Sequence, residues 1–332
     1  MTGRSTAAPE TASLAAHLAR RGLVRDTSRL EVAALAGGVS NDVFAVTAPG
    51  LDAVVKRALG RLRVAEEWLA DPARIDTEGR ALRLAGQLAP GAVPRVLDLA
   101  DGYLVIERAP RTWRTWKDDL LAGTVHTAVA ERLGRVLGSW QRATAGSVAV
   151  AAEFGDRTAF TQLRVDPFHR TIAARHPDLA GPITRTVEVM EATATCLVHG
   201  DYTPKNVMVD PRGPGQWVID WEVAHFGDPT FDPSWAVGHL LLKSVHRPSS
   251  AAAYAQAAEA FLGGLRDELD DAVALDPEQL VRQTGCLVLA RVDGKSPVEY
   301  LDDGGRARAR DLGRRLLSTS QAAVLDAWKA LM

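Results

Sequence analysis

The segment VHGDYTPKNVMVD, residues 198–210, places a polar loop between two short apolar runs. The runs CLV at 196–198 and VMV at 207–209 are rich in bulky and β-branched residues, which is typical of short strands. The loop between them carries side chains that exchange protons or bind metal ions, namely His199, Asp201, Lys205 and Asn206. A surface turn needs no such groups, so this loop is the first candidate for chemistry.

The composition is that of an ordinary globular protein and favours no charged macromolecular partner. The chain has 332 residues, of which 46% are hydrophobic and 24% charged, with a formal net charge of -2. This length favours two lobes or domains. Arginines are scattered among acids, which argues against a nucleic-acid partner, and no run of about 18 apolar residues predicts a membrane span. We expect a monomer or homodimer that binds neither nucleic acid nor a membrane.

The cysteines and the N-terminal residues indicate the cellular compartment of the protein. Cys196 and Cys286 lie inside apolar runs, and neither has a CxxC partner. Buried free thiols are the simplest interpretation, which is typical of a reducing compartment. The opening residues, MTGRSTAAPETA, are polar and contain no apolar core of a secretory signal. We therefore expect a cytoplasmic protein.

The first third of the chain predicts a meander of short strands. Turn residues separate runs rich in Val, Leu and Ile, and one helical pattern over 77–88 places Glu78 among apolar residues on one face. The expected strands lie within 30–36, 43–47, 53–57, 95–99 and 103–107.

Helical spacing dominates after Pro110. Asp276 is the expected N-cap of one helix, with Pro277 at its first position. The helices expected from apolar spacing cover 124–141, 251–265, 276–291 and 308–331. The organisation predicted from these patterns is a β-rich lobe at 1–107, a hinge at 108–111 and a helical lobe at 112–332.

Oxygen-bearing side chains recur around the polar loop at a spacing that suits a metal ion. Asp201 and Asn206 lie five residues apart, and Asp220 follows the apolar run WVI, fourteen residues after Asn206. Two adjacent strands would bring the three to one end of the pair. Hard oxygen ligands with room for substrate phosphates suit Mg²⁺. Asp201 would then face an acceptor hydroxyl, as phosphoryl transfer requires, while His199 would pack beneath the loop and support it.

These motifs together carry a resemblance. HGDYTPKN at 199–206, followed by VIDWE at 218–222 and GDPTFD at 227–232, resembles the catalytic core of the aminoglycoside phosphotransferase family. Methylthioribose kinases are the nearest named relatives in this resemblance, which extends from the Gly37 loop to the helix after Asp232. The resemblance implies a bilobal protein-kinase-like α+β fold, with an antiparallel N-lobe sheet and a mainly helical C-lobe.

The resemblance also implies roles for individual residues in the helical lobe. Asp201 would be the catalytic Asp, and Asn206 and Asp220 would be the metal ligands. Asp232 would be a buried anchor for the catalytic loop. Because Asp232 starts an expected helix, an N-cap role is compatible with that function.

The turn GGVSND at 37–42 is similar to the looser phosphate loop of small-molecule kinases. Taken alone it is a hairpin turn, but its place one strand ahead of the run VVK predicts that Ser40 reaches the β-phosphate of ATP.

The run YLVIERAP at 103–110 resembles a kinase hinge. The carbonyl of Glu107 and the amide of Ala109 would then meet the adenine edge.

Lys56, at the end of the run AVVK, would contact the α- and β-phosphates as a point charge. It needs an acidic partner, and Glu78 is the expected one because a charge on an apolar helix face is costly unless paired. Glu66 and Glu67 are the alternatives. The insert 60–76 that contains them resembles the corresponding stretch of methylthioribose kinases.

Four residues are candidates for the acceptor site. Trp113 follows the hinge and would wall a substrate cleft. Glu222 lies two residues after Asp220, where methylthioribose kinases also place an acid. Arg291 and Glu299 belong to the charged interruption ARVDGKSPVEYL at 290–301, for which a solvated loop is the alternative interpretation.

The combined prediction is an ATP-dependent phosphotransferase that moves the γ-phosphate of ATP, with Mg²⁺, to a hydroxyl of a small molecule. The acceptor stays open between an aminoglycoside and a methylthioribose-like sugar or other metabolite, and ATP is not separated from GTP. A second alternative is a nucleotide-binding pseudokinase. That class usually lacks a catalytic Asp, a metal Asp or a strand Lys, whereas this chain has Asp201, Asp220 and Lys56.

Overall fold

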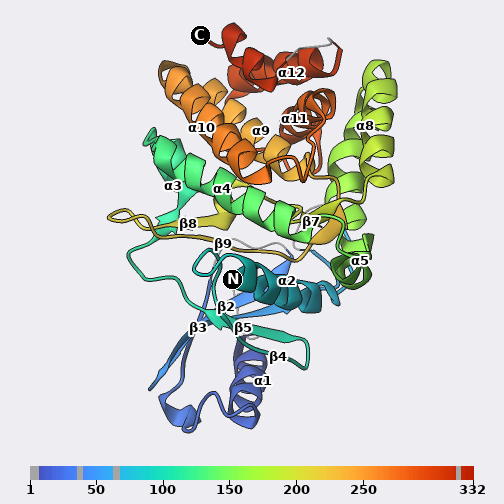
Figure 1. Ribbon diagram of the computed structural model, residues 1–332. Coiled ribbons are helices and arrows are strands. Elements are labelled where there is room, and N and C mark those ends of the chain that lie inside the picture. Colours follow the sequence, from blue (N-terminus) through green and yellow to red (C-terminus); the bar gives the residue numbers. More distant parts are fainter. Residues whose placement is uncertain (1–6, 36–39, 63–67, 319–322) are drawn as a thin grey trace.

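The computed structural model describes residues 7–35, 40–62, 68–318 and 323–332. Figure 1 shows a sheet with helix α1 (Ala7–Arg20) at one end of the molecule, a mainly helical body at the other, and helix α2 (Arg74–Leu88) between them. This is the predicted bilobal α+β arrangement. In the part of the chain that is described, no helix is long and apolar enough to cross a membrane.

Within the described residues, five antiparallel strands form the sheet, in the order β1-β2-β3-β5-β4. Side chains alternate between its faces. Val55 and Val105 pack with Leu14 and Leu18 of α1, whereas Leu104 belongs to the cluster that includes α2. The strands match all the predicted ones: β1 (Glu31–Ala34), β2 (Asn41–Ala48), β3 (Leu51–Ala58), β4 (Val96–Ala100) and β5 (Tyr103–Glu107).

Helix α2 begins three residues before the predicted start at 77 and contacts both parts of the molecule. Its buried residues Ala81, Leu82 and Ala85 share one hydrophobic cluster with Leu104 of β5 and with Trp140. The indole N–H of Trp140 donates to the Ala85 carbonyl at 3.0 Å. The position of α2 is therefore set from the sheet and from the helical body together.

The helical body contains the predicted helices and several shorter ones. Asp276 caps α11 as expected, because its carboxylate accepts the backbone N–H groups of Glu278 and Gln279 at 2.9 and 3.1 Å. A π-helix (Thr161–Arg170) lies where no helix was predicted. The α-helices are α3 (Trp116–Ala122), α4 (Thr127–Thr144), α5 (Val148–Phe154), α6 (Thr158–Phe160), α7 (Thr171–Arg175), α8 (Ala180–Ala192), α9 (Phe231–His246), α10 (Ala251–Leu269), α11 (Pro277–Asp293) and α12 (Asp303–Ser318). Single 3-10 turns cover Thr27–Arg29, Pro177–Leu179, Pro204–Asn206 and Pro248–Ser250.

The end of the chain differs from the prediction of one helix over 308–331. Helix α12 ends at Ser318, and a separate 3-10 helix covers Val324–Ala330. Trp328 of this short helix is buried, and its indole donates to the Ser244 hydroxyl of α9 at 2.8 Å. The docking of this aromatic side chain on α9 replaces the continuation of α12.

The polar loop 199–206 connects one small sheet to another. It leaves β7 (Cys196–Val198), which pairs with β10 (His225–Gly227), and enters β8 (Val207–Val209). Strand β8 lies between β6 (Arg114–Thr115) and β9 (Gln216–Val218). The predicted pairing of β8 with the strand that precedes Asp220 is present, so the loop and Asp220 lie at the same end of the pair. Both cysteines are buried and free.

Helices α4 and α10 approach each other closely through glycines, which gives a test of the packing. A Cβ at Gly264 would lie 2.5 Å from the Glu131 carbonyl oxygen, whereas at Gly263 it would meet nothing within 4 Å. We expect Gly264→Ala to lower the free energy of unfolding by about 1–3 kcal/mol through overpacking. Gly263→Ala should raise it by up to about 1 kcal/mol through helix propensity. Urea unfolding measures both, and equal effects would contradict the close contact.

Candidate active site

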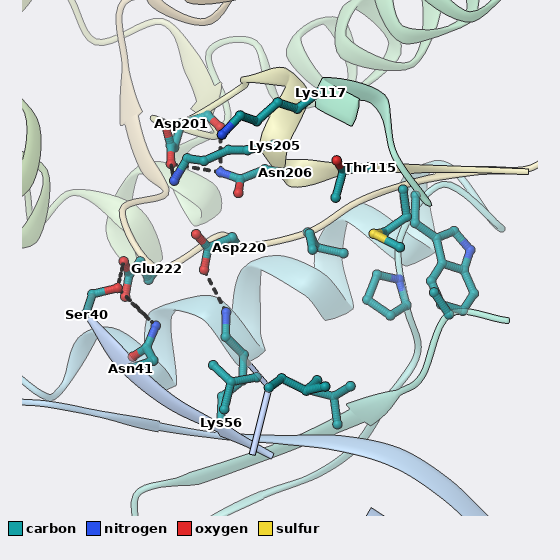
Figure 2. Close-up of a pocket in the computed structure, with 18 of the residues that line it drawn as sticks. Ser40, Asn41, Lys56, Thr115, Lys117, Asp201, Lys205, Asn206, Asp220 and Glu222 are labelled. Carbon is teal, nitrogen blue, oxygen red and sulfur yellow. Dashed lines mark hydrogen bonds and ion pairs between the residues drawn. The ribbon is translucent and has the colours of Figure 1, made fainter. Parts of the chain in front are cut away.

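A cavity of about 890 Å³ lies between the sheet and the helical body, lined by residues of both. Figure 2 shows how its polar side chains converge from β2, β3, the loop 199–206 and the segment after β9. The predicted site residues that line it are Ser40, Lys56, Glu107, Ala109, Trp113, Asp201, Asn206, Asp220, Glu222 and Arg291.

Lys56 lies between two carboxylates. Its ammonium donates to both carboxylate oxygens of Glu78, at 2.6 and 2.8 Å, and to Oδ1 of Asp220 at 2.7 Å. Burial alone lowers the pKa of Lys56, but Asp220 and Glu78 outweigh it and hold the pKa above its ordinary value. The expected Lys56–Glu78 contact is therefore present. The alternative partners Glu66 and Glu67 lie outside the described residues.

Asp201 is buried, and three neighbouring side chains contact the same oxygen of its carboxylate. Oδ2 receives Arg164 Nη2 at 2.8 Å, Lys205 Nζ at 2.9 Å and Asn206 Nδ2 at 2.8 Å. In the part of the chain that is described, no donor contacts Oδ1. Burial raises the pKa of Asp201, but Arg164 and Lys205 outweigh it, so the pKa lies below its usual range. One carboxylate oxygen thus stays available to a substrate group.

The backbone of the polar loop is held from below by Asp232 and His199. The Asp232 carboxylate accepts the backbone N–H groups of His199 and Gly200 at 2.7 and 2.9 Å. It therefore contacts the loop and does not cap its own helix, α9. His199 Nδ1 accepts the Asp201 N–H at 3.0 Å, and burial lowers the pKa of His199 to about 4. His199 is therefore neutral near pH 7, and its contacts are those of a supporting residue.

Asn206 and Asp220 are brought together by the pairing of β8 and β9. The Ile219 N–H donates to the Asn206 carbonyl at 2.9 Å, and Asp220 follows with a φ of 71°, a left-handed conformation that is costly for a residue with a Cβ. This conformation accompanies the contact of Asp220 with Lys56. Figure 2 shows the Asn206 amide and the Asp220 carboxylate facing the same space.

These two oxygen donors fit a hard divalent cation. The amide nitrogen of Asn206 is used on Asp201, which leaves its amide oxygen, and Lys56 contacts only Oδ1 of Asp220. Among the described residues, no group of three or more His, Cys, Asp or Glu side chains is placed to hold a metal. A cation here would therefore take further ligands from a bound phosphate, as Mg²⁺ commonly does.

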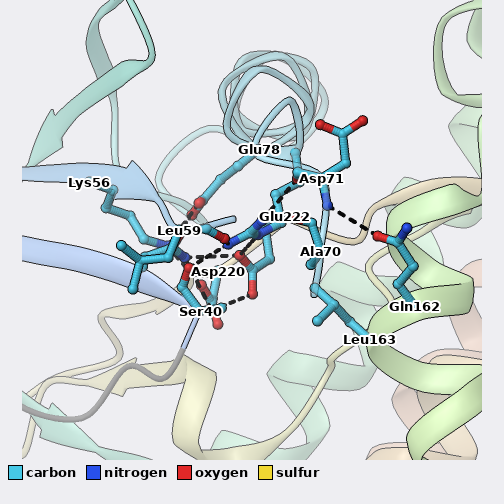
Figure 3. A network of polar contacts seen from close by, with 12 residues as sticks. Ser40, Lys56, Leu59, Ala70, Asp71, Glu78, Gln162, Leu163, Asp220 and Glu222 are labelled. Atoms are coloured by element: carbon cyan, nitrogen blue, oxygen red, sulfur yellow. Dashed lines mark hydrogen bonds and ion pairs between the residues drawn. The ribbon is translucent and has the colours of Figure 1, made fainter. Parts of the chain in front are cut away.

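Glu222 and Ser40 both line the cavity, and there they contact each other. Glu222 was expected to contact acceptor or metal, and Ser40 to contact the β-phosphate. The Ser40 hydroxyl donates to Glu222 at 2.7 Å, and the Asn41 amide donates to the second carboxylate oxygen at 2.9 Å. Glu222 is buried and bound within the protein, so its observed contacts are structural (Figure 3).

Arg74 completes this network from the start of α2. Its Nε donates to Glu222 at 3.0 Å, and its guanidinium also donates to the carbonyls of Ser40, Leu59 and Asp71. A buried arginine that pairs with a carboxylate and saturates backbone carbonyls fixes several chain segments at once. The end of the turn 37–42 is thus tied to the segment that follows Asp220.

Three other predicted residues occupy different ends of the cavity. Trp113 lies at the hinge end, where its backbone N–H donates to the Pro110 carbonyl and its ring meets Trp217 edge-on at 5.2 Å. Its role in the acceptor cleft stays a prediction. Arg291 lines the cavity on α11. Glu299 pairs with Lys117, but its side chain is 65% exposed and does not line the cavity.

Sequence reasoning did not assign Arg164, Arg74 or Asn41. Arg164 comes from the π-helix, a stretch without a helical apolar pattern, and Arg74 comes from the insert before the predicted helix. No spacing rule connects either arginine to its carboxylate. Asn41 lies in the turn GGVSND, so its polar amide beside Ser40 was the only sequence signal that pointed to one of these three residues.

Comparisons with known proteins identify the family of the chain. Residues 31–272 match the model of the phosphotransferase enzyme family. A search of curated proteins yields no match.

Solved structures show the same fold at low sequence identity. A proposed aminoglycoside phosphotransferase from Ralstonia eutropha has a TM-score of 0.58 at 17% identity, covering 97% of this chain and 94% of its own. Amicoumacin kinase hAmiN, in complex with AMP-PNP, Ca²⁺ and its antibiotic, has a TM-score of 0.56 at 14% identity, covering 96% and 99%. Macrolide 2'-phosphotransferase MphH from Brachybacterium faecium has a TM-score of 0.50 at 20% identity, covering 96% and 97%. The family match covers most of the chain, and the chain belongs to the phosphotransferase enzyme family of small-molecule kinases, as its motifs predicted.

Proposed function

We propose that the protein is an ATP-dependent phosphotransferase that transfers the γ-phosphate of ATP to a hydroxyl group of a small molecule. One observation carries the proposal. Lys56, paired with Glu78, reaches Asp220 on one side of a cavity, and Asp201 with Asn206 lies on the other side. A phosphate-binding cation, metal-binding oxygens and a hydroxyl-facing carboxylate are the groups that phosphoryl transfer needs.

The nucleotide is assigned to the half of the cavity next to the hinge. Glu107 and Ala109 line this half together with Val54, Ile106 and Met208, an apolar slot that suits a purine ring. Lys56 follows on β3, where the phosphates would lie. The amicoumacin kinase complex with AMP-PNP supports the choice of ATP. In this proposal residues 1–107 form the nucleotide-binding lobe, 108–111 the hinge and 112–332 the lobe with the catalytic loop.

Asn206 and Asp220 would hold Mg²⁺, which supplies charge neutralisation to the phosphates when bound. Lys56 holds Asp220 in place through its 2.7 Å contact, and the left-handed backbone at Asp220 turns the carboxylate toward the cavity. Without Glu78 the ammonium would have one fixed partner fewer. The pair thus positions both the metal ligand and the cation for the phosphates.

Asp201 orients the acceptor. Its free Oδ1 accepts a hydrogen bond from the substrate hydroxyl, whose oxygen then attacks the γ-phosphorus while the bond to the β–γ bridging oxygen breaks and ADP leaves. The hydroxyl proton passes to Asp201. Because Arg164 and Lys205 hold the pKa of Asp201 low, it accepts the proton late, after most of the bond to ADP has broken, which suits a loose transition state.

ATP binding and turnover together test the proposal. Bound Mg·ATP at a hundred times its Kd should stabilise the protein by about 2.7 kcal/mol in thermal unfolding. A panel of aminoglycosides, macrolides, sugars and metabolite alcohols, scored for ATP consumption, then identifies acceptors. Stabilisation without turnover of any alcohol would favour the pseudokinase alternative, and neither effect would contradict both.

We expect Asp201→Asn to reduce kcat by about 10²–10⁴-fold, because the hydroxyl loses its proton acceptor, and to change Mg·ATP affinity by less than about threefold. Steady-state kinetics and calorimetry measure the two effects. Asp210→Asn, the same change in the turn between β8 and β9 outside the cavity, is the matched control. A loss of ATP affinity as large as the loss of rate would contradict this role.

Asp220→Ala should weaken Mg·ATP binding itself by at least about tenfold, because the variant removes a metal ligand and the second partner of Lys56. Titration calorimetry with and without Mg²⁺ measures the change. Unaltered affinity of the variant for Mg·ATP would rule out Asp220 as a ligand.

Glu78→Gln should lower kcat and raise KM for ATP by roughly tenfold each, since Lys56 loses a fixed counter-charge while the apolar face of α2 keeps the fold. Kinetics and circular dichroism separate these outcomes, with Glu188→Gln on the exposed face of α8 as control. Wild-type kinetics in Glu78→Gln would count against the positioning role.

A further inference from the structure

Basic side chains gather in the half of the cavity beyond Asp201, away from the hinge. They come from different elements of the helical body, so no single helix accounts for the cluster. The basic residues that line the cavity there are Lys117 of α3, Arg164 of the π-helix, Lys205 of the catalytic loop, His239 of α9 and Arg291 of α11.

Arg291 lines this part of the cavity, and part of its guanidinium group has no hydrogen-bond partner among the described residues. Its Nη1 donates to the hydroxyl of Ser296 at 2.9 Å, which fixes the side chain. Its Nε is buried without a hydrogen-bond partner, as is the hydroxyl of Tyr300, and Nη2 has no partner either among the residues described. Buried donors are normally satisfied, and those left open mark places where a ligand or ordered water belongs.

Lys243 is buried beneath this wall. Its side chain is 1% exposed, its ammonium lies 5.4 Å above the Tyr300 ring, and its one hydrogen bond, to the His239 carbonyl, is long at 3.4 Å. Within the described residues it forms no ion pair. Burial, with Lys117 and Arg291 nearby, lowers the pKa of Lys243 to about 7. A buried cation without a counter-charge is costly, and an anion above it would offset that cost.

The acidic groups near this wall are already engaged. Asp118, which also lines the cavity, accepts a hydrogen bond from the Thr115 hydroxyl at 2.7 Å. Asp201 is already neutralised by Arg164 and Lys205, and the carboxylate of Glu299, which pairs with Lys117, is 65% exposed. The remaining positive charge belongs to Arg291, whereas burial holds the pKa of His239 well below its ordinary value and leaves a neutral imidazole beside it. A polycationic acceptor would meet like charge here.

The phosphates of ATP do not account for Arg291, His239 and Lys243. Asp220, which marks the phosphate end, is influenced by Lys56, Lys205 and Arg164. Arg291 and Lys243 belong instead to α11 and α9 and surround Tyr300 and Glu299. Apolar and aromatic side chains line the cavity beside these groups, namely Trp68, Leu163, Phe168 and Trp235, and the Arg164 guanidinium lies 5.6 Å from the centre of the Trp235 ring.

We infer that the acceptor is an anionic alcohol, a small hydroxylated molecule with a carboxylate or phosphate group that binds Arg291 and His239 while its hydroxyl faces Asp201. This inference rests on the proposed function. The aromatic side chains contact the carbon skeleton of the acceptor. Polycationic aminoglycosides and choline-like cations are disfavoured by the charge of Arg291.

Anion binding tests the site directly and without any substrate. Calorimetry with inorganic sulfate, at constant ionic strength and with AMP-PNP and Mg²⁺ present, should show binding that falls by at least about tenfold in Arg291→Gln. Arg185→Gln, on the exposed face of α8, is the matched control and should bind as the wild type does. His239→Gln provides a second variant in case Arg291→Gln fails to fold. Sulfate binding that is absent, or unchanged in both cavity variants, would overturn the inference.

Matched acceptors test the substrate class. ATP consumption is measured with gluconate against glucose, glycerate against glycerol, and ribose 5-phosphate against ribose, with kanamycin and choline as cations. We expect kcat/KM to be higher for the anionic member of a pair and to fall at least about tenfold in Arg291→Gln for that member alone. The gluconate and ribose 5-phosphate arms distinguish carboxylate from phosphate.

The outcomes separate the two proposals. Turnover of kanamycin, choline or a neutral sugar that exceeds that of the anions and is unchanged in Arg291→Gln would refute the anionic acceptor and leave the phosphotransferase proposal intact. Arg291-dependent sulfate binding in a protein that neither binds Mg·ATP nor consumes ATP would support the anion site and refute the phosphotransferase proposal.

Discussion

The contact of one buried ammonium with two carboxylates organises this molecule. Lys56 belongs to β3, Glu78 to α2 and Asp220 to the segment after β9, so the contact exists only when three separate elements are in place. An ammonium removed from water costs several kcal/mol unless it is paired. Burial raises the pKa of Glu78 to about 7, whereas at Asp220 burial is outweighed by the neighbouring Lys56, which holds the pKa below its ordinary value. Asp220 is therefore an ionised carboxylate that faces the cavity, and such a group suits a divalent cation.

A second buried pair lies beside the first (Figure 3). Arg74 and Glu222 contact at 3.0 Å, and each also binds the turn that carries Ser40. The turn over the expected phosphate position is therefore attached to the segment that presents Asp220. Movement of one requires breaking buried, charge-assisted hydrogen bonds of the other, which are the stronger kind in proteins.

Much of the fold was predictable because its signals are local. Alternating apolar residues and glycine turns define the strands of the sheet, and Asp276 marks a helix start through the hydrogen bonds it makes. The loop 199–206 was recognisable because the chemistry requires particular side chains at a particular spacing. The terminal helix was predicted too long, because the docking of Trp328 on Ser244 is a tertiary event with no local signal.

The parts of the site that escaped prediction are those that depend on distant contacts. Ser40 and Glu222 are separated by 182 residues, and a hydrogen bond across that distance leaves no periodic pattern. Arg164 reaches Asp201 from a π-helix with Pro167 inside it, a geometry that apolar spacing does not indicate. The Lys56–Glu78 contact was accessible to reasoning because a carboxylate on an apolar helix face demands a partner.

The packing of α2 has a consequence for how this helix can move. Ala81, Leu82 and Ala85 share a hydrophobic cluster with Trp140, so any outward swing of this helix uncovers apolar surface of both parts. Exposing two or three such side chains costs about 4 kcal/mol or more, which limits the swung-out population to about one molecule in a thousand. Displacement of this helix from the helical body is therefore opposed by the packing that α2 shares with Trp140.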